Sequence, residues 1–314
     1  MDFSLTSKYW KFLILKNLKE LSTSGVAKYA ETVARNYATW TDFNENQISN
    51  LCKLPLMQKN ININKLHSGF SRSESLKHNM LISLLFSQIE NDNLTKKLYS
   101  LSDDGYLFGG HPFHNLKGKA ITLDKISSIL EIKVFKECLV DDSIVCELGA
   151  GSGRTAEAIM TIYPKIRYII ADLPPASFIA KHRLNLVFPE KKIVVAQTFL
   201  ELASFLESPF SWDVIFCLPS LLKFLPDKSI DLLLAIDCLH EMSDKMRNYV
   251  STVVDSKSIY FYFKIWESTK IPLDNVELNS LSPSDYFIKD KWEILLDQEA
   301  LFPGNFREFI FKIN

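Results

Sequence analysis

The sequence has little glycine and no excess of either charge. It holds 10 glycines in 314 residues, and 36 Lys and Arg residues balance 37 Asp and Glu residues to leave a net charge of −1. The basic surplus typical of proteins that bind nucleic acid is therefore missing. With 47% hydrophobic and 23% charged residues, the composition is that of a globular protein, long enough for one large domain or two smaller ones.

The sequence also lacks paired cysteines and long apolar runs. Its five cysteines are scattered and form no CxxC pair, so we expect reduced, buried thiols in a reducing compartment. Lys11, Lys16 and Lys19 interrupt the apolar pattern at the start of the chain, which fits neither a signal peptide nor an anchor. No other run reaches the roughly 18 uncharged apolar residues of a membrane helix. We therefore expect a cytoplasmic protein with no membrane insertion.

The first 108 residues show apolar residues at three- and four-residue spacing, which predicts amphipathic helices. The clearest segments are 8–21, 26–40 and 73–90. The stretch GGHP at 109–112 interrupts this pattern, because two glycines and a proline make continuation of a helix improbable. We place a domain boundary there, between an all-helical domain at 1–115, expected to cap the substrate, and a second domain at 116–314.

The second domain alternates short apolar runs with amphipathic helices. Near-continuous apolar strands of this kind predict a parallel sheet covered by helices on both faces. The last two strands flank the turn FPGN at 302–305 and are expected to form an antiparallel hairpin. The fold class is therefore α/β, with a Rossmann-like, mostly parallel sheet. The predicted strands are 144–148, 167–172, 212–218, 231–237, 258–265, 291–298 and 306–313, and the predicted helices are 123–139, 154–163, 176–188 and 243–254.

Three of the few glycines fall in ELGAGSG at 147–153, where the first predicted strand ends. Gly149, Gly151 and Gly153 would let the chain turn sharply and let backbone N–H groups approach a ligand; a turn without a ligand is the alternative. The second strand ends in Asp172, whose carboxylate can accept hydrogen bonds from both hydroxyls of a ribose. Asp172 could instead cap the next helix. Both features suit a nucleotide-type cofactor, NAD included.

The fourth predicted strand leads into DCLHEMSD at 237–244. His240 is a candidate general base, since imidazole has an ordinary pKa of about 6.5, and a core histidine is the alternative. Glu241 is a second proton acceptor. Glu267, after the fifth strand, could orient the imidazole or be a solvated loop residue. Asp237 and Glu267 would suit Mg²⁺, but the acidic doublet that would complete such a site is missing, so we predict no metal.

The stretch ELGAGSGR resembles motif I of class I S-adenosylmethionine-dependent methyltransferases. This resemblance implies S-adenosylmethionine as the cofactor, with the glycine loop and Glu147 at its methionine part. It also implies Asp172 and Leu173 at the ribose, and apolar contacts near Leu218 at the adenine. The segment LHEMSDKMRNY is similar to the LHDWSD-type segment of small-molecule O-methyltransferases, whose histidine removes the acceptor proton, which would be His240 here.

Four stretches together resemble a family of sugar O-methyltransferases encoded in polysaccharide and glycosylated-antibiotic gene clusters: GGHPF, ELGAGSGR, ADLPPASFIAKHRL and LPDKSIDLLLAIDCLHEMSD. Members usually have glutamine where His240 stands, and GNP where this chain has GGHP. The resemblance implies O-methylation of a sugar, nucleotide-sugar or glycan in polysaccharide or glycoconjugate biosynthesis, and a homodimer would be compatible with it. The alternatives are an NAD-type dehydrogenase and a catalytically inactive methyltransferase fold that serves as an interaction module.

Overall fold

The computed structural model describes residues 6, 8–37, 53, 61–101, 113–116, 118–208, 210–266, 283–286, 288–303 and 306–314. It divides into two compact units, a larger one of residues 1–23 with 135–314 and a smaller one of residues 24–134. The predicted domains, 1–115 and 116–314, stay a prediction. Helix α1 (Lys8–Tyr37) contains a break at Gly25, with φ 78° and ψ 165°, next to the point where the chain passes from one unit to the other.

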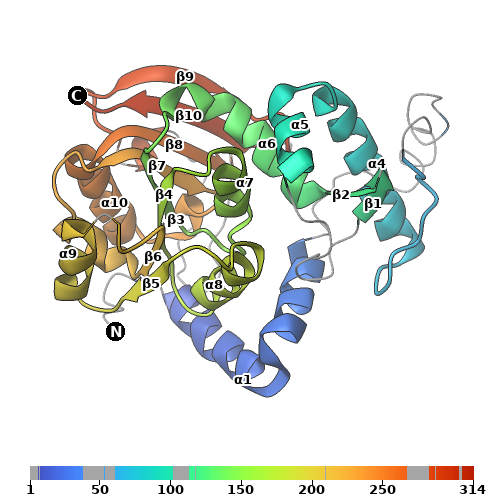
Figure 1. The fold of residues 1–314 in the computed structure, drawn as a ribbon, viewed down its shortest axis with the longest axis horizontal. Helices are drawn as coiled ribbons and strands as arrows, with labels where there is room; N and C mark the ends of the chain where they lie inside the picture. Colours follow the sequence, from blue (N-terminus) through green and yellow to red (C-terminus); the bar gives the residue numbers. More distant parts are fainter. Residues whose placement is uncertain are drawn as a thin grey trace. The chain divides into compact units, whose positions relative to one another are not determined.

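The larger unit is built on an eight-stranded sheet with the order β5-β6-β4-β3-β7-β8-β10-β9 (Figure 1). Strands β5, β6, β4, β3, β7 and β8 are parallel, and β10 pairs antiparallel with both β8 and β9. This arrangement confirms the predicted mostly parallel sheet with a C-terminal antiparallel hairpin. The strands are β3 (Ile144–Leu148), β4 (Arg167–Ala171), β5 (Ile193–Ala196), β6 (Val214–Cys217), β7 (Ile230–Ile236), β8 (Ser258–Trp266), β9 (Glu293–Glu299) and β10 (Phe306–Lys312).

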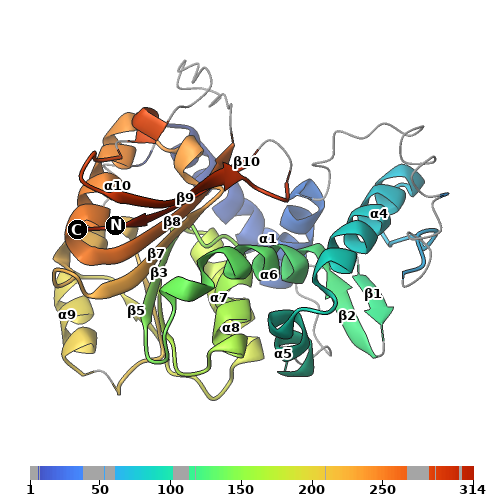
Figure 2. The same cartoon turned by 90° about the horizontal axis from the view of Figure 1, so that it is seen from above.

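Helices cover both faces of this sheet, as the continuous apolar strands predict. Helices α7 and α8 lie on one side of the strands, and α9 and α10 lie on the other (Figure 2). The face toward α9 and α10 forms one apolar core with Leu202 of α9 and Val250 and Val254 of α10. The helices are α7 (Arg154–Ile162), α8 (Ala176–Val187), α9 (Phe199–Glu207) and α10 (Asp244–Lys257), with short 3₁₀ turns η2 (Lys136–Cys138), η3 (Pro219–Phe224), η4 (Leu239–Glu241) and η5 (Pro283–Tyr286).

Two elements of the larger unit, β5 and α9, were not predicted. Strand β5 has four residues, is flanked by Lys192 and Gln197, and remains partly exposed at the edge of the sheet, so its apolar run is short. Helix α9 begins at a capping box, in which the Thr198 hydroxyl accepts a hydrogen bond from the Glu201 amide and the Glu201 side chain accepts one from the Thr198 amide. A T-x-x-E signal of this kind was present in the sequence and predicts a helix start.

The smaller unit contains helices and one short hairpin. Helix α4 begins at a capping box formed by Ser71 and Glu74. The hairpin of β1 and β2 was not predicted, because strands of four residues are too short for a clear alternation. Asn115 closes its turn by accepting a hydrogen bond from the Gly118 amide at 3.0 Å. The elements are α4 (Arg72–Ile89), α5 (Asn93–Leu101), β1 (Phe113–Leu116), β2 (Lys119–Thr122) and α6 (Leu123–Phe135), which passes into the larger unit at its last residue.

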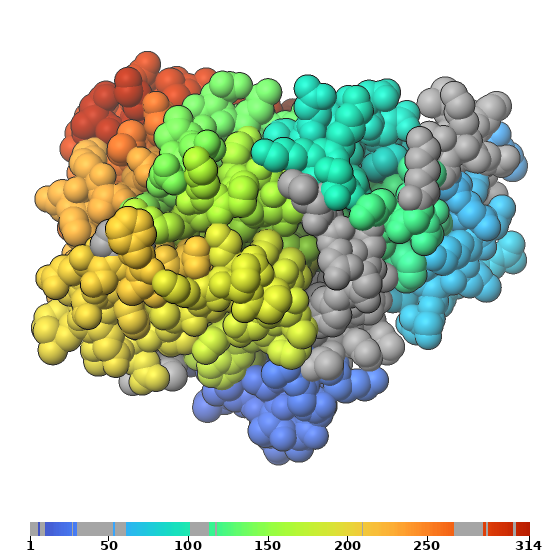
Figure 3. Space-filling model, in the orientation of Figure 1, coloured from blue at the N-terminus to red at the C-terminus, as the bar shows by residue number. Residues whose placement is uncertain are grey.

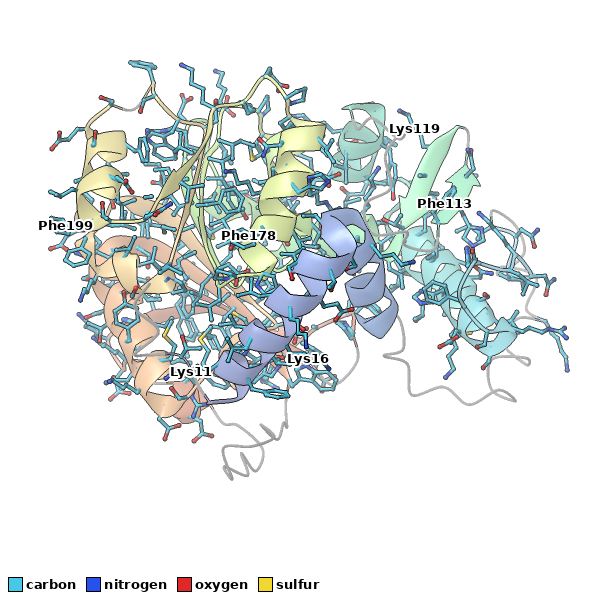
Figure 4. The ribbon with its side chains drawn as sticks, turned by 90° about the horizontal axis from the view of Figure 1, so that it is seen from below. Lys11, Lys16, Phe113, Lys119, Phe178 and Phe199 are labelled. Carbon is cyan, nitrogen blue, oxygen red and sulfur yellow. The ribbon has the colours of Figure 1, made fainter. Side chains whose placement is uncertain are left out.

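The surface of the larger unit carries single apolar side chains. Figure 3 shows α8 and α9, coloured yellow-green to yellow, at the surface, and Phe178 and Phe199 of these helices are exposed (labelled in Figure 4). Scattered exposed residues of this kind are ordinary in globular proteins. Among the helices that the structure describes, none combines the length and the apolar character needed to cross a membrane.

Candidate functional site

The predicted site residues follow the carboxyl ends of neighbouring parallel strands. Two backbone hydrogen bonds tie these ends together: the Gly149 amide donates to the Ala171 carbonyl at 3.0 Å, and the Asp172 amide donates to the Cys217 carbonyl at 3.2 Å. The central strands β3, β4, β6 and β7 are parallel, so the segments after them meet at one edge of the sheet. This edge is where open α/β sheets bind ligands.

The three glycines after β3 have different neighbours. A Cβ atom on Gly149 would lie 2.8 Å from the Cys238 Cβ, and one on Gly153 would lie 3.1 Å from the Ala180 Cβ. These two positions therefore need glycine because other segments pack against them. A Cβ on Gly151 would have no neighbour within 4 Å, although the residue has a φ of +57°. Gly151 thus leaves open space beside the backbone, as expected where a ligand lies against the loop.

Asp172 is joined directly to this loop. One carboxylate oxygen accepts a hydrogen bond from the Gly151 amide at 2.9 Å, and the other accepts one from the Leu173 amide at 2.6 Å. Helix α8 has Pro175 at its N-cap and no side-chain cap, so the helix-capping interpretation of Asp172 is wrong. Burial raises the pKa of Asp172 to about 6, against the lowering effect of the two amides. The predicted ribose acceptor is therefore hydrogen-bonded to the glycine loop.

Glu147 lies within β3 rather than at its open end. Its side chain is 2% exposed, and one carboxylate oxygen accepts a hydrogen bond from the Tyr168 hydroxyl at 2.9 Å. Tyr168 lies in β4, on the same face of the sheet. Leu218 follows β6 and is the N-cap residue of η3. The roles of Glu147 at the methionine part, of Leu173 at the ribose and of Leu218 at the adenine stay predictions.

His240 lies in η4 and is 4% exposed. Its Nε2 atom is 3.5 Å from an Asp237 carboxylate oxygen, and within the described part of the chain its buried Nδ1 atom has no hydrogen-bond partner. The ring also meets Trp266 edge-on, with 6.3 Å between the ring centroids. Burial lowers the pKa of His240 to about 4, so the imidazole is neutral near pH 7. Its role as general base stays a prediction.

Asp237 has an unusual backbone for a residue other than glycine, with a φ of +55°. This conformation is held by its amide, which donates to the Lys264 carbonyl at 2.8 Å, and by its carboxylate, which accepts a hydrogen bond from the Trp266 indole at 2.9 Å. A positive φ is uncommon for a residue other than glycine, although aspartate adopts it more readily than most. Trp266 was missed by the sequence analysis, although it directly precedes the predicted Glu267.

Among the described groups at this edge whose pKa is clearly shifted, Glu241 has the pKa nearest to neutrality. Burial, together with the negative charges of Asp237 and Asp172, raises the pKa of Glu241 to about 7, against the lowering effect of a hydrogen bond from the Trp10 side chain. Trp10 belongs to the first half of α1, which is part of the larger unit. Trp10 could not be singled out from the sequence, since its spacing fits the apolar face of an ordinary amphipathic helix.

The predicted Glu267 lies outside the described residues. Within the part of the chain that the structure describes, no group of three or more His, Cys, Asp or Glu side chains is placed to hold a metal ion. Four cysteines in the described segments are free and buried. The residues that the structure does bring together are Gly151 with Asp172, and Asp237 with His240 and Glu241.

A family model for the O-methyltransferase domain matches residues 120–201, the stretch with the glycine loop and Asp172. The fold is a Rossmann-like α/β fold with a mostly parallel sheet, as predicted. The match also supports the predicted enzyme class and cofactor, an O-methyltransferase that uses S-adenosylmethionine. The open space at Gly151 and the carboxylate of Asp172 fit that cofactor. The comparison with curated protein sequences gave no match.

Several solved structures are similar to this chain. One is an S-adenosylmethionine-dependent methyltransferase from Aquifex aeolicus, with 16% identity over 58% of this chain and 88% of that chain, at a TM-score of 0.37. Another, from Clostridium acetobutylicum, has 12% identity over 60% of this chain and 90% of that chain, at 0.38. The mitomycin 7-O-methyltransferase MmcR has 12% identity over 76% of this chain and 63% of that chain, at 0.39.

Proposed function

We propose that the protein transfers a methyl group from S-adenosylmethionine to a hydroxyl of a sugar, nucleotide-linked sugar or glycan. The observation that carries this proposal is the direct contact between the glycine loop and the acid of the next strand, at 2.9 Å from the Gly151 amide to the Asp172 carboxylate. The cofactor supplies an electrophilic methyl group on a sulfonium. The chain supplies the glycine loop that would bind this cofactor and the side chains that would accept the proton.

The proposed cofactor contacts follow from the geometry of the loop. Gly151 offers open backbone to the methionine part, and Asp172, with Leu173 beside it, offers an acceptor to the ribose hydroxyls. Glu147 supports the loop from within β3, and Leu218 provides an apolar contact at the adenine. Holding the sulfonium methyl group and the acceptor hydroxyl oxygen in line, about 3 to 3.5 Å apart, would account for much of the rate enhancement.

A sugar acceptor is supported by the sequence resemblance, whose most specific feature is the double proline after the ribose acid. The structure adds two carboxyl groups, Asp237 and Glu241, on the segment that follows β7. Carboxylates can accept hydrogen bonds from the neighbouring hydroxyls of a sugar. His240 and Glu241 are the candidates to take the proton, with Glu267 as the predicted partner of the imidazole. The cytoplasmic location and the homodimer stay predictions.

Isothermal titration separates this proposal from a dehydrogenase and from an inactive module. We expect S-adenosylhomocysteine to bind with micromolar affinity and NAD not to bind. Binding of NAD alone would favour the dehydrogenase, and binding of neither ligand would favour the interaction module. Transfer of labelled methyl groups to a panel of nucleotide-sugars and glycans then tests the acceptor class; labelling only of acceptors without a sugar would contradict the sugar assignment.

A further inference from the structure

The short turn after β7 places Glu241 next to two other acids. The negative charges of Asp237 and Asp172 both raise the pKa of Glu241. The charges of all three acids also raise the pKa of the Cys238 thiol. Since Asp172 contacts the Gly151 amide, Glu241 belongs to the edge that holds the proposed cofactor loop. Its side chain is partly exposed, unlike the buried His240, so a substrate can reach it more readily.

The first half of α1 brings Trp10 to this carboxyl group. The half-helix is amphipathic: Ile14 is 5% exposed, whereas Lys11 and Lys16 are exposed (Figure 4). The Trp10 side chain is half-buried and hydrogen-bonded to Glu241. An indole N–H can only donate a hydrogen bond, so the glutamate oxygen is the acceptor. This bond favours the charged carboxylate over the neutral acid.

His240 is poorly placed to receive a proton from a substrate. Its Nε2 atom faces Asp237 at 3.5 Å, and its buried Nδ1 atom has no hydrogen-bond partner among the described residues. A general base needs a lone pair within reach of the substrate hydroxyl. An imidazole that is 4% exposed offers little such access.

We infer that Glu241 accepts the proton of the sugar hydroxyl, and that Trp10 is a positioning residue that holds its carboxylate in place and in the charged form. This inference rests on the proposed function. The O–H bond breaks and its proton moves to a carboxylate oxygen of Glu241 as the hydroxyl oxygen takes the methyl group. The proton then passes to water, and its charge balances the positive charge lost by the sulfonium. No further reactant is needed.

The electrostatics of the edge agree with this role. Burial and the charges of Asp237 and Asp172 raise the pKa of Glu241 to about 7, close to the cytosolic pH at which a general base works best. Burial lowers the pKa of His240 to about 4, which would make it a weak base. Glu241 should therefore lose activity as a base below about pH 7, whereas His240 would stay deprotonated down to about pH 4.

The first test compares two substitutions in steady-state kinetics across pH. Glu241→Gln should lower kcat by about 10²-fold or more and abolish the low-pH limb near pH 7. His240→Gln, the residue usual in the resembling family, should keep that limb, whatever its effect on kcat. The inference is overturned if Glu241→Gln retains the limb or if only His240→Gln removes it. S-adenosylhomocysteine affinity should persist in both variants; its absence in the wild type would instead contradict the proposed function.

The second test isolates Trp10. Trp10→Phe keeps an aromatic ring and removes the N–H donor, so the low-pH limb of kcat should move upward by about one pH unit while kcat at pH 9 changes little. A merely structural role would lower kcat equally at every pH. Phe12→Leu, at an α1 side chain that is 54% exposed, is the matched control and should leave the profile unchanged. An unshifted limb in Trp10→Phe would overturn the role of Trp10.

Discussion

At the scale of single residues, Gly151 differs from the other loop glycines in having free space around its Cα. We expect Gly151→Val to abolish S-adenosylhomocysteine binding, because the side chain would occupy that space, while the positive φ costs about 1 to 2 kcal/mol of stability. Gly149→Ala should mainly lower the melting temperature, since its Cβ would lie 2.8 Å from the Cys238 Cβ. Calorimetric titration and thermal melts distinguish these outcomes; a folded Gly151→Val with full affinity would remove the loop from the site.

Asp172 gives cofactor binding a predicted pH dependence. Its pKa is raised by burial to about 6, so the carboxylate acceptor is present above that pH and is lost below it. We expect S-adenosylhomocysteine affinity to fall between pH 7.5 and pH 5. Asp172→Ala should weaken binding at pH 7.5 by about 1.5 to 3 kcal/mol and flatten the dependence. Equal affinity for the two proteins would show that Asp172 does not bind the cofactor.

At the scale of elements, Asp255 joins α10 to the segment before β9. Its carboxylate binds the Lys289 and Lys291 ammonium groups at 2.7 and 2.8 Å and the Trp292 indole at 3.0 Å. Burial alone would raise the pKa of Asp255, but these three partners lower it well below its usual range. A carboxylate of this kind stabilises the fold above the unfolded pKa of about 3.9, and the contribution is lost as the pH falls further.

We therefore expect Asp255→Asn to lower the melting temperature at pH 7 by roughly 2 °C and the difference from wild type to shrink as the pH falls below 4. Asp227→Asn is the control, because Asp227 also pairs with a lysine, Lys257, at 2.6 Å but has a side chain that is 77% exposed. An equal effect of both substitutions, or one independent of pH, would contradict the role of Asp255.

The elements that the sequence predicted best are those with long apolar signals. Strand β3 has the predicted bounds, because five apolar or buried positions precede an abrupt glycine turn. The contact of Gly151 with Asp172 also follows from pattern alone, since both come after adjacent parallel strands. The hydrogen bond of Trp10 to Glu241 could not be predicted, because it joins distant parts of the chain through tertiary packing. The hydrogen bond from the Tyr168 hydroxyl to Glu147 could not be predicted either, because the sequence does not show which side chain of the next strand lies beside Glu147.

At the scale of the whole molecule, all described candidate cofactor residues belong to the larger unit. If the two units unfold separately, differential scanning calorimetry should show two transitions. S-adenosylhomocysteine at about 100 times its dissociation constant should stabilise only one of them, by about 2.7 kcal/mol. Gly151→Val should remove this response. A single transition that shifts as a whole would show that the chain unfolds as one cooperative body.

The break in α1 at Gly25 has a consequence for biosynthesis. The larger unit is discontinuous in sequence, since residues 1–23 join residues 135–314 and the smaller unit is inserted between them. On the ribosome, domains tend to fold as units in the order in which they emerge. Trp10 is translated early, yet its partner Glu241 is made only after the whole inserted unit. The hydrogen bond between Trp10 and Glu241 therefore forms only after residues 24–134 have been translated.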